Sequence, residues 1–143
     1  MPFTFLDDIA TSDAAFEATG RTVEELFVAA ADATMNVMVA DLNTIAKKEF
    51  RTIRVEADAL DMLLFELLQE LIFFKDAERL LLRVPEVRID STDDHFVLSA
   101  EAYGEELDAQ VHDLVVDVKA VTLHRYRVEK TGRGWEAMVI LDI

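Results

Sequence analysis

Carboxylate groups near the two ends of the chain are the residues whose types and spacing most favour a specific chemistry. Asp7, Asp8 and Asp13 lie in one short acidic stretch, and Asp142 stands next to the terminal carboxylate of Ile143. If the last strand runs beside the first, these groups meet at one end of a sheet. Ca²⁺ and Mg²⁺ prefer hard oxygen ligands of this kind. The residues therefore allow a divalent-metal site, although an acidic loop of this kind is more commonly just solvated.

Sequence motifs of catalysis are absent. The chain has no glycine-rich phosphate loop of the GxxxxGK[ST] or GxGxxG type and no GxSxG nucleophile motif. It has no cysteine, and His95, His112 and His124 lack the HExxH spacing of a zinc site. We interpret these histidines as structural or surface residues. The sequence therefore predicts a binding protein without catalytic residues of its own.

The strongly acidic composition restricts the partners. A formal net charge of −15 repels phosphate groups, so the protein alone is not expected to bind nucleic acid. A partner with a positive face would be attracted, although solubility alone also explains such a charge. One modest basic patch is interpreted as the exposed face of a strand; it comprises Lys119, His124, Arg125, Tyr126 and Arg127.

No segment of the sequence predicts a membrane span or a signal peptide. The longest apolar stretch, within residues 60–74, is short and is interrupted by acidic and amide side chains. The first residues lack a basic segment followed by an apolar one. We therefore expect a cytoplasmic protein that does not contact membranes.

Two helices and a set of strands are expected to position these groups. Thr22 and Glu25 form a T-x-x-E capping box before an apolar stripe at three- and four-residue spacing, which predicts a helix. A second helix, with a wider apolar arc, follows Asp58, which we interpret as its cap. Pro85 is expected at a strand edge or bulge. Alternating apolar residues predict strands at 3–6, 14–18, 47–57, 81–89, 95–103, 116–129 and 135–142.

The order of these elements predicts an α+β fold. Most strands follow the helices, which is typical of a mostly antiparallel sheet with two helices packed on one face. The length of 143 residues fits one domain, so residues 1–143 are expected to form a single unit.

Several segments, in order along nearly the whole chain, resemble the archease family. TSD (11–13) and GRTVEELF (20–27) are similar to its T-A-D and G-x-T-x-E-E-L-F opening. LLFELLQELI (63–72) resembles its L-L-x-x-x-L-x-E-L helix, and AYGE (102–105) its A-x-G-E segment. VKAVTLH (118–124) and ILDI (140–143) resemble its V-K-A-[IV]-T-x-H strand and closing D-[IV]. Each match is weak alone, but the ordered set is specific.

This resemblance implies a helper of the RtcB-type RNA ligase, which joins RNA ends in tRNA splicing and RNA repair. Archeases promote guanylylation of the active-site His of the ligase and allow it many turnovers, without being ligases themselves. The family fold is a strand–helix–strand–strand module with an inserted strand region. Its members bind a divalent metal through the Asp of T-A-D and the last two residues. The implied ligands here are Asp13, Asp142 and Ile143, with Ca²⁺ expected and Mg²⁺ or Mn²⁺ as alternatives.

The chain departs from the family pattern at two positions. Many archeases read H-T-A-D-[IL]-G, whereas this chain has Ala10 and Ala15 at the His and Gly positions. Asp13 is kept, so the implied metal ligand is present. The role of the His is then either absent or taken over by Asp7 or Asp8. Lys119 and His124 match motif positions but receive no assigned role.

Two other functions stay open from the sequence. The acidic surface also suits a general chaperone or adaptor that binds other proteins. A metal-dependent phosphohydrolase using Asp13 and Asp142 is the third possibility, although no paired base or nucleophile accompanies these carboxylates.

Overall fold

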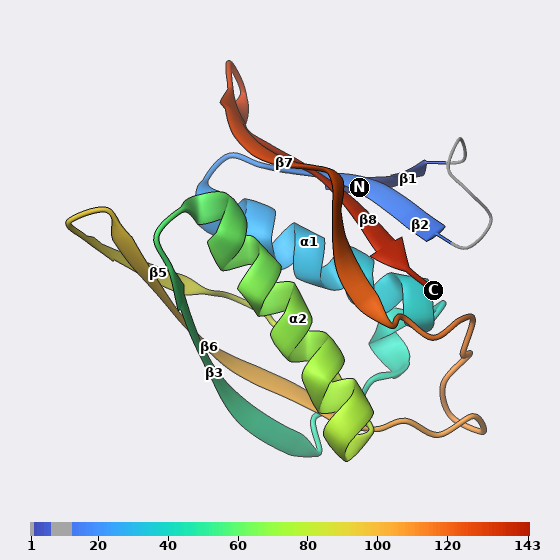
Figure 1. The fold of residues 1–143 in the computed structure, drawn as a ribbon. Helices are drawn as coiled ribbons and strands as arrows, with labels where there is room; N and C mark the ends of the chain where they lie inside the picture. Colours follow the sequence, from blue (N-terminus) through green and yellow to red (C-terminus); the bar gives the residue numbers. More distant parts are fainter. Residues whose placement is uncertain (1, 7–12) are drawn as a thin grey trace.

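Two helices lie between two antiparallel sheets, as Figure 1 shows. The computed structural model describes residues 2–6 and 13–143. The helices are α1 (Val23–Met38) and α2 (Leu60–Glu78), and a short 3-10 turn, η1 (Leu42–Thr44), follows α1. The strands are β1 (Phe3–Leu6), β2 (Asp13–Gly20), β3 (Glu49–Ala57), β4 (Leu80–Arg83), β5 (Arg88–Thr92), β6 (His95–Glu106), β7 (Ala120–Thr131) and β8 (Gly134–Asp142).

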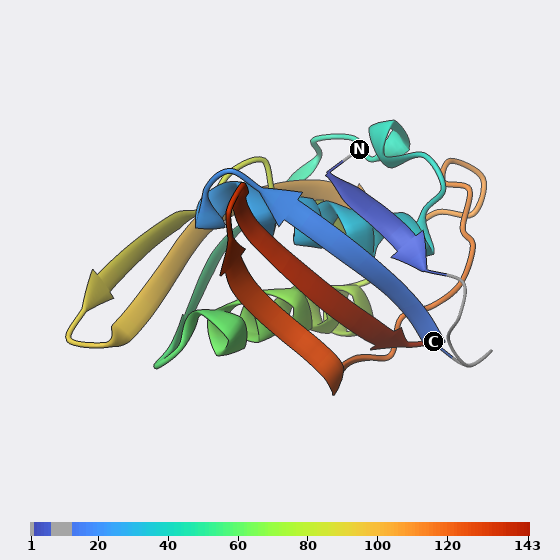
Figure 2. The same cartoon turned by 90° about the horizontal axis from the view of Figure 1, so that it is seen from above.

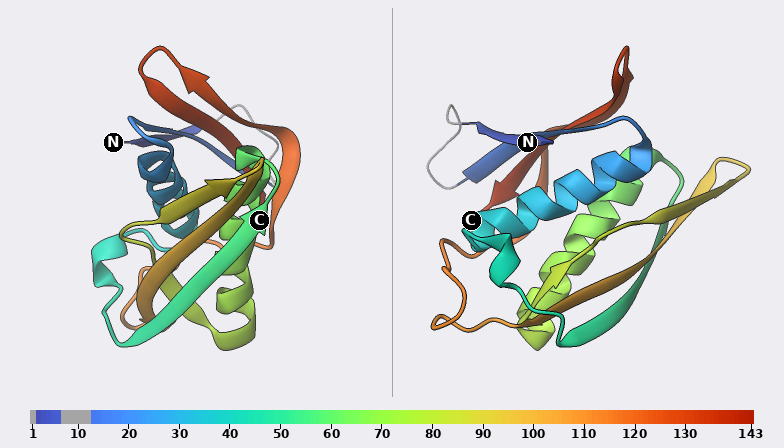
Figure 3. Two further views of the ribbon diagram at one scale, coloured as in Figure 1. Left: turned by 90° about the vertical axis from the view of Figure 1, so that its left-hand side faces the viewer. Right: turned by 180° about the vertical axis from the view of Figure 1, so that it is seen from behind.

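Each sheet covers the helices from one side. The first has the order β1-β2-β8-β7, seen from above in Figure 2, and the second has the order β3-β6-β4, with β5 also paired to β6. All these pairings are antiparallel, so the predicted α+β class is confirmed. The strands divide into two sheets because α2 is apolar over a wide arc. It packs on β3, β4 and β6 of one sheet and on β7 of the other (Figure 3).

Helix α1 begins where the capping box predicts. Thr22 is the N-cap, and its hydroxyl accepts a hydrogen bond from the amide of Glu25 at 3.1 Å. The Glu25 carboxylate reaches back to the amide of Arg21 at 2.8 Å, one residue before the cap. These bonds satisfy amides that have no partner within the helix. The helix then buries Phe27 and Met35 completely.

The predicted cap of α2 is wrong. The N-cap is Ala59, which makes no side-chain cap bond, and its carbonyl accepts the first helical bond from Leu63 at 2.9 Å. Asp58 instead lies 2.8 Å from His95 Nδ1 at the start of β6. The Asp58 side chain therefore makes a tertiary contact with His95 instead of capping the helix.

Strand bounds differ from the predictions mainly around two irregular segments. The apolar run at 81–89 splits into β4 and β5, and Pro85 lies between them, where its missing N–H is tolerated. The run predicted to begin a strand at residue 116 starts one only at Ala120. Residues 107–119, hereafter the 107–119 loop, instead connect β6 to β7 outside both sheets.

Candidate metal centre

Asp13 and Asp142 lie directly opposite each other in the first sheet. Asp13 opens β2, Asp142 closes β8, and the two are register partners in this antiparallel pair. Directly opposed residues project from the same face of a sheet, with Cβ atoms about 5 Å apart. Both side chains are half-buried, and Ile143 follows immediately and packs against the main core. The three residues implied as metal ligands are therefore brought together, at the end of the sheet where Figure 2 shows the C-terminus.

The apolar pattern of β2 and β8 enforces this register. Phe16, Ala18, Val139 and Leu141 are completely buried on the face toward the helices. A shift of one residue would turn these side chains away from the core, so the register is strongly specified. The last strand thus runs beside β2 rather than β1. By the same alternation, Asp13 and Asp142 project from the face away from the helices.

The chemistry of the donors fits a hard divalent cation. The ion pairs found among residues 2–6 and 13–143 involve other carboxylates, and none includes Asp13 or Asp142. Two opposed carboxylates repel each other unless a cation lies between them. Within the described part of the chain, no cluster of three or more His, Asp or Glu side chains could hold a metal. A site here would therefore add main-chain oxygen from Ile143. Asp7 and Asp8 lie outside the described residues.

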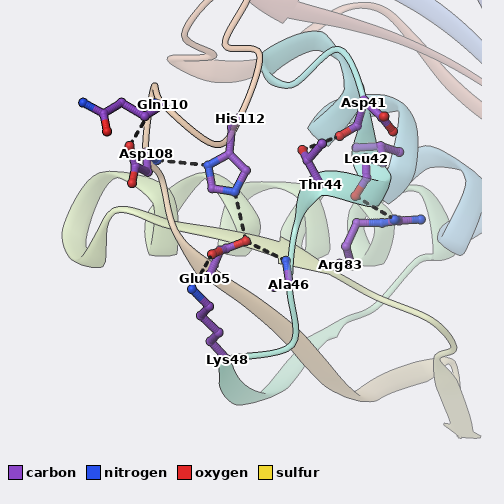
Figure 4. A network of polar contacts seen from close by, with 10 residues as sticks. All are labelled: Asp41, Leu42, Thr44, Ala46, Lys48, Arg83, Glu105, Asp108, Gln110 and His112. Atoms are coloured by element: carbon purple, nitrogen blue, oxygen red, sulfur yellow. Dashed lines mark hydrogen bonds and ion pairs between the residues drawn. The ribbon is translucent and has the colours of Figure 1, made fainter.

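A buried polar network fixes the start of the 107–119 loop (Figure 4). The Glu105 carboxylate accepts hydrogen bonds from the Ala46 amide at 2.7 Å and from His112 Nε2 at 3.1 Å. The Asp108 amide donates to His112 Nδ1 at 3.0 Å. Because Nδ1 accepts, the proton of a neutral ring lies on Nε2, which then donates to Glu105. Lys48 lies 3.4 Å from the other Glu105 oxygen.

Local sequence patterns predict no contact of this network. His112 was expected to be structural or superficial, and it is structural: its side chain is fully buried. In the sequence, Glu105 stands out only as the last residue of the AYGE segment. The one sequence signal is that Glu105 directly follows a run of strand-forming residues. A carboxylate in such a position is either exposed or, if buried, almost always paired.

The carboxyl group of Glu105 has a lowered pKa, chiefly because the Ala46 amide donates to it. Burial acts in the opposite direction, but the Ala46 bond together with the weaker contributions of His112 and Lys48 outweighs it. Glu105→Gln removes this charge and is expected to lower the free energy of unfolding at pH 7 by about 2 kcal/mol. Because the pKa of Glu105 is lower in the folded than in the unfolded protein, its ionised carboxylate stabilises the fold above pH 4.5, the ordinary pKa. This stability is lost as the pH falls through the pKa of the folded protein. The difference in unfolding free energy between the wild-type protein and Glu105→Gln should therefore become smaller below pH 4.5.

Urea unfolding between pH 7 and pH 3 measures this difference. Glu106→Gln is the matched control, because the Glu106 side chain next to Glu105 is 72% exposed and should change stability by less than about 0.5 kcal/mol. Equal curves for the two variants would contradict the assigned role of Glu105.

Lys75 anchors the other end of the loop. Its side chain, only 7% exposed, makes ion pairs with Asp117 and Asp76, and its ammonium donates to the Val118 carbonyl at 2.8 Å. Burial lowers the pKa of Lys75, but the hydrogen bonds to the two carboxylates outweigh it and the pKa is raised. The Lys119 amide then donates to the Asp142 carbonyl at 2.8 Å. The loop is therefore tied to α2 and to the candidate metal centre.

The basic patch expected on β7 is only partly basic. Arg127 pairs with Glu136 at 2.8 Å and also approaches Glu17 and Glu129. His124 and Arg125 are exposed at an irregularity in the β7–β8 register, where Arg125 has a φ of 54°. Tyr126 is half-buried, and its hydroxyl donates to the Asp61 carbonyl at 2.6 Å. Arg127 and Tyr126 are thus committed to internal contacts, whereas Lys119, His124 and Arg125 remain exposed.

A cavity of about 860 Å³ lies at the opposite end of β2 and β8 from Asp13 and Asp142. Gly20, Trp135, Arg21 and Arg133 help to line it, together with acidic side chains such as Glu24. Its mixture of charges favours no single class of ligand. Among the described helices, none is long and apolar enough to cross a membrane.

The fold and the acidic sheet end define a small α+β protein with two antiparallel sheets around two helices. Residues 3–143 match the model of the Archease protein family (MTH1598/TM1083). Protein archease of Pyrococcus abyssi is 40% identical over 134 residues, which cover 93% of this chain and 94% of that protein. Protein archease of Methanothermobacter thermautotrophicus is 36% identical over 141 residues, covering 99% and 98%. The chain belongs to the archease family.

Solved structures show the same fold. The solution structure of Methanobacterium thermoautotrophicum protein 1598 matches with a TM-score of 0.84 and 36% identity, covering 99% of each chain. A crystal structure from Thermotoga maritima, described as an archease and possible chaperone, matches with a TM-score of 0.61 over 94% of this chain and 93% of that one. Its identity to this chain is 17%, so it supports the fold alone.

Proposed function

We propose that this protein activates an RtcB-type RNA ligase in the cytoplasm, promoting guanylylation of the active-site His of the ligase and repeated turnover. The protein itself contributes no catalytic residue. The observation that carries the proposal is the opposed pair of Asp13 and Asp142, which has no cationic partner among the described residues. Membership of the archease family gives this pair its proposed context.

In this proposal the acidic sheet end is a metal-binding tip. Asp13, Asp142 and main-chain oxygen of Ile143 would hold a divalent cation, with Ca²⁺ expected and Mg²⁺ or Mn²⁺ as alternatives. Such a cation stabilises negative charge on phosphoryl oxygens. The task of the chain is to hold its carboxylates in a fixed register and to present them at the end of the sheet. The net charge of −15 would attract a ligase whose nucleotide site is basic.

A general chaperone is the second candidate, because a net charge of −15 also suits the binding of other proteins with positive surfaces. The Thermotoga maritima protein is described as a possible chaperone, but it shares only the fold with this chain. A metal-dependent phosphohydrolase has less support. It would use the same metal ligands, Asp13 and Asp142, as the proposed tip. A hydrolase would also need a positioned base, and the described histidines pair with carboxylates elsewhere or lie exposed on β7.

The deciding experiment measures guanylylation of an RtcB-type ligase from the same organism, with radiolabelled GTP and substoichiometric amounts of this protein. We expect faster labelling of the ligase and more ligated RNA per ligase, with no label on this protein. Bovine serum albumin at equal concentration is the control. Unchanged labelling, together with suppressed aggregation of an unrelated heated protein, would favour the chaperone instead.

A further inference from the structure

The 107–119 loop presents a cluster of large apolar side chains to solvent. Four of them fall within six residues and are between 38% and 58% exposed: Val111, Leu114, Val115 and Val116. Single exposed apolar residues are ordinary on protein surfaces, but contiguous groups mark interaction sites. The position of this group therefore requires an explanation.

The loop is held rigidly in this outward arrangement. Its middle is bonded to the end of α1, where the Val115 amide donates to the Met38 carbonyl and the Ala40 amide donates to the Asp113 carbonyl, both at 2.9 Å. Its ends are fixed by the buried His112 and Lys75 contacts. A loop fixed in advance loses little conformational freedom when a partner binds. The buried polar anchors thus hold these apolar side chains in an exposed position.

The loop lies at the same end of the molecule as the candidate metal centre. Figure 1 and the right-hand view of Figure 3 both place it beside the C-terminus. The Lys119 amide is bonded to the Asp142 carbonyl at 2.8 Å. Val116 precedes Lys119 by three residues, so their Cα atoms are at most about 11 Å apart. A partner that reaches Asp142 would therefore also meet the loop.

Charge defines the chemistry of that partner. Asp113 is exposed among the apolar side chains, and Asp13 and Asp142 lie beside the loop. Asp117 is also exposed but is already paired with Lys75. The complementary surface is an apolar patch with Lys and Arg at its rim. We propose that the 107–119 loop is the docking surface for the partner ligase, seating its valines on such a patch next to the nucleotide site. This inference rests on the proposed function and adds the surface that provides affinity.

The test is the concentration of this protein that gives half-maximal guanylylation of the ligase. The double variant Val115→Ser, Val116→Ser is expected to raise that concentration about 10- to 100-fold, because two side chains lose apolar burial against the ligase. The maximal rate at saturation should be unchanged, since the metal-binding tip is intact. Both side chains are exposed in the free protein, so the urea midpoint should also be unchanged. Phe50→Ser on β3 is the control, since Phe50 is 62% exposed in the other sheet.

The outcomes separate this inference from the proposed function. Full stimulation by the wild-type protein with the same half-maximal concentration for the double variant overturns the docking surface alone. Absence of stimulation by the wild-type protein overturns the proposed function and the docking surface with it. A wild-type dimer in sedimentation equilibrium that becomes a monomer in the double variant assigns the surface to a second copy, and also overturns the proposal.

Discussion

Asp13→Asn is expected to abolish stimulation of the partner ligase while leaving the fold intact. The substitution removes one of two opposed carboxylates, so a hard cation loses a charged ligand. We expect the affinity for Ca²⁺, measured by titration calorimetry, to fall by about 100-fold or more. Guanylylation at saturating concentrations of the variant should then equal that of the ligase alone.

The free energy of unfolding gives a second, independent test of the role of Asp13. Without metal, Asp13→Asn should raise the free energy of unfolding by about 0.5 kcal/mol, because it removes repulsion between like charges across β2 and β8. Calcium at 100 times its dissociation constant should stabilise the wild-type protein by about 2.7 kcal/mol and the variant far less.

Asp94→Asn is the matched control for this substitution. Asp94 lies in the β5–β6 turn at a φ of 61°, which asparagine adopts readily. This variant should keep both calcium affinity and stimulation. A full calcium response in Asp13→Asn, or its loss in Asp94→Asn, would contradict the assigned metal-binding tip.

Strand periodicity predicts the faces on which Asp13 and Asp142 lie. Their direct opposition also requires β2 and β8 to be neighbours, which the sequence offers only as a condition and through the family resemblance. The alternation of β8 places Asp142 on the face opposite Val139 and Leu141, and the same rule places Asp13 opposite Phe16. The sequence also predicted the α1 cap and both helices, since these depend on residues within a few positions of one another.

Contacts between distant segments could not be predicted in this way. The bond between Ala46 and Glu105 spans 59 positions, and that between Lys75 and Asp117 spans 42. Nothing local distinguishes such residues from solvated charges. The same limit explains the wrong cap at Asp58, whose carboxylate is used by His95, and the late start of β7, because the valines before Ala120 read as a strand.

Gly104 is expected to tolerate no side chain, which gives the AYGE segment a physical meaning. Gly104 lies within β6, and a Cβ atom added there would lie 1.8 Å from the Leu81 carbonyl oxygen and 2.8 Å from its carbon. Both are backbone atoms of β4, so a rotamer change cannot relieve the overlap. Strand β4 would have to move away from β6, against its packing on α2 and the burial of Leu81 and Leu82.

Gly104→Ala should therefore lower the free energy of unfolding by about 4 kcal/mol or more, placing it among the exceptional single substitutions. For a chain of this size the melting temperature should fall by about 10 °C or more. Circular dichroism melts and urea titrations measure both quantities. The shift would also disturb Glu105, the next residue, and with it the His112 contact that fixes the 107–119 loop.

Gly132→Ala separates steric overlap from the general effect of replacing glycine. Gly132 lies in the turn between β7 and β8, and an added Cβ atom would meet nothing within 4 Å. This variant should differ from the wild-type protein by less than about 0.5 kcal/mol. If Gly104→Ala were as stable as Gly132→Ala, the close approach of β4 to β6 could not be the reason that glycine stands at position 104. The strain would then have to be absorbed by a shift of β4 that costs little, and the Glu105 network would be expected to shift with it.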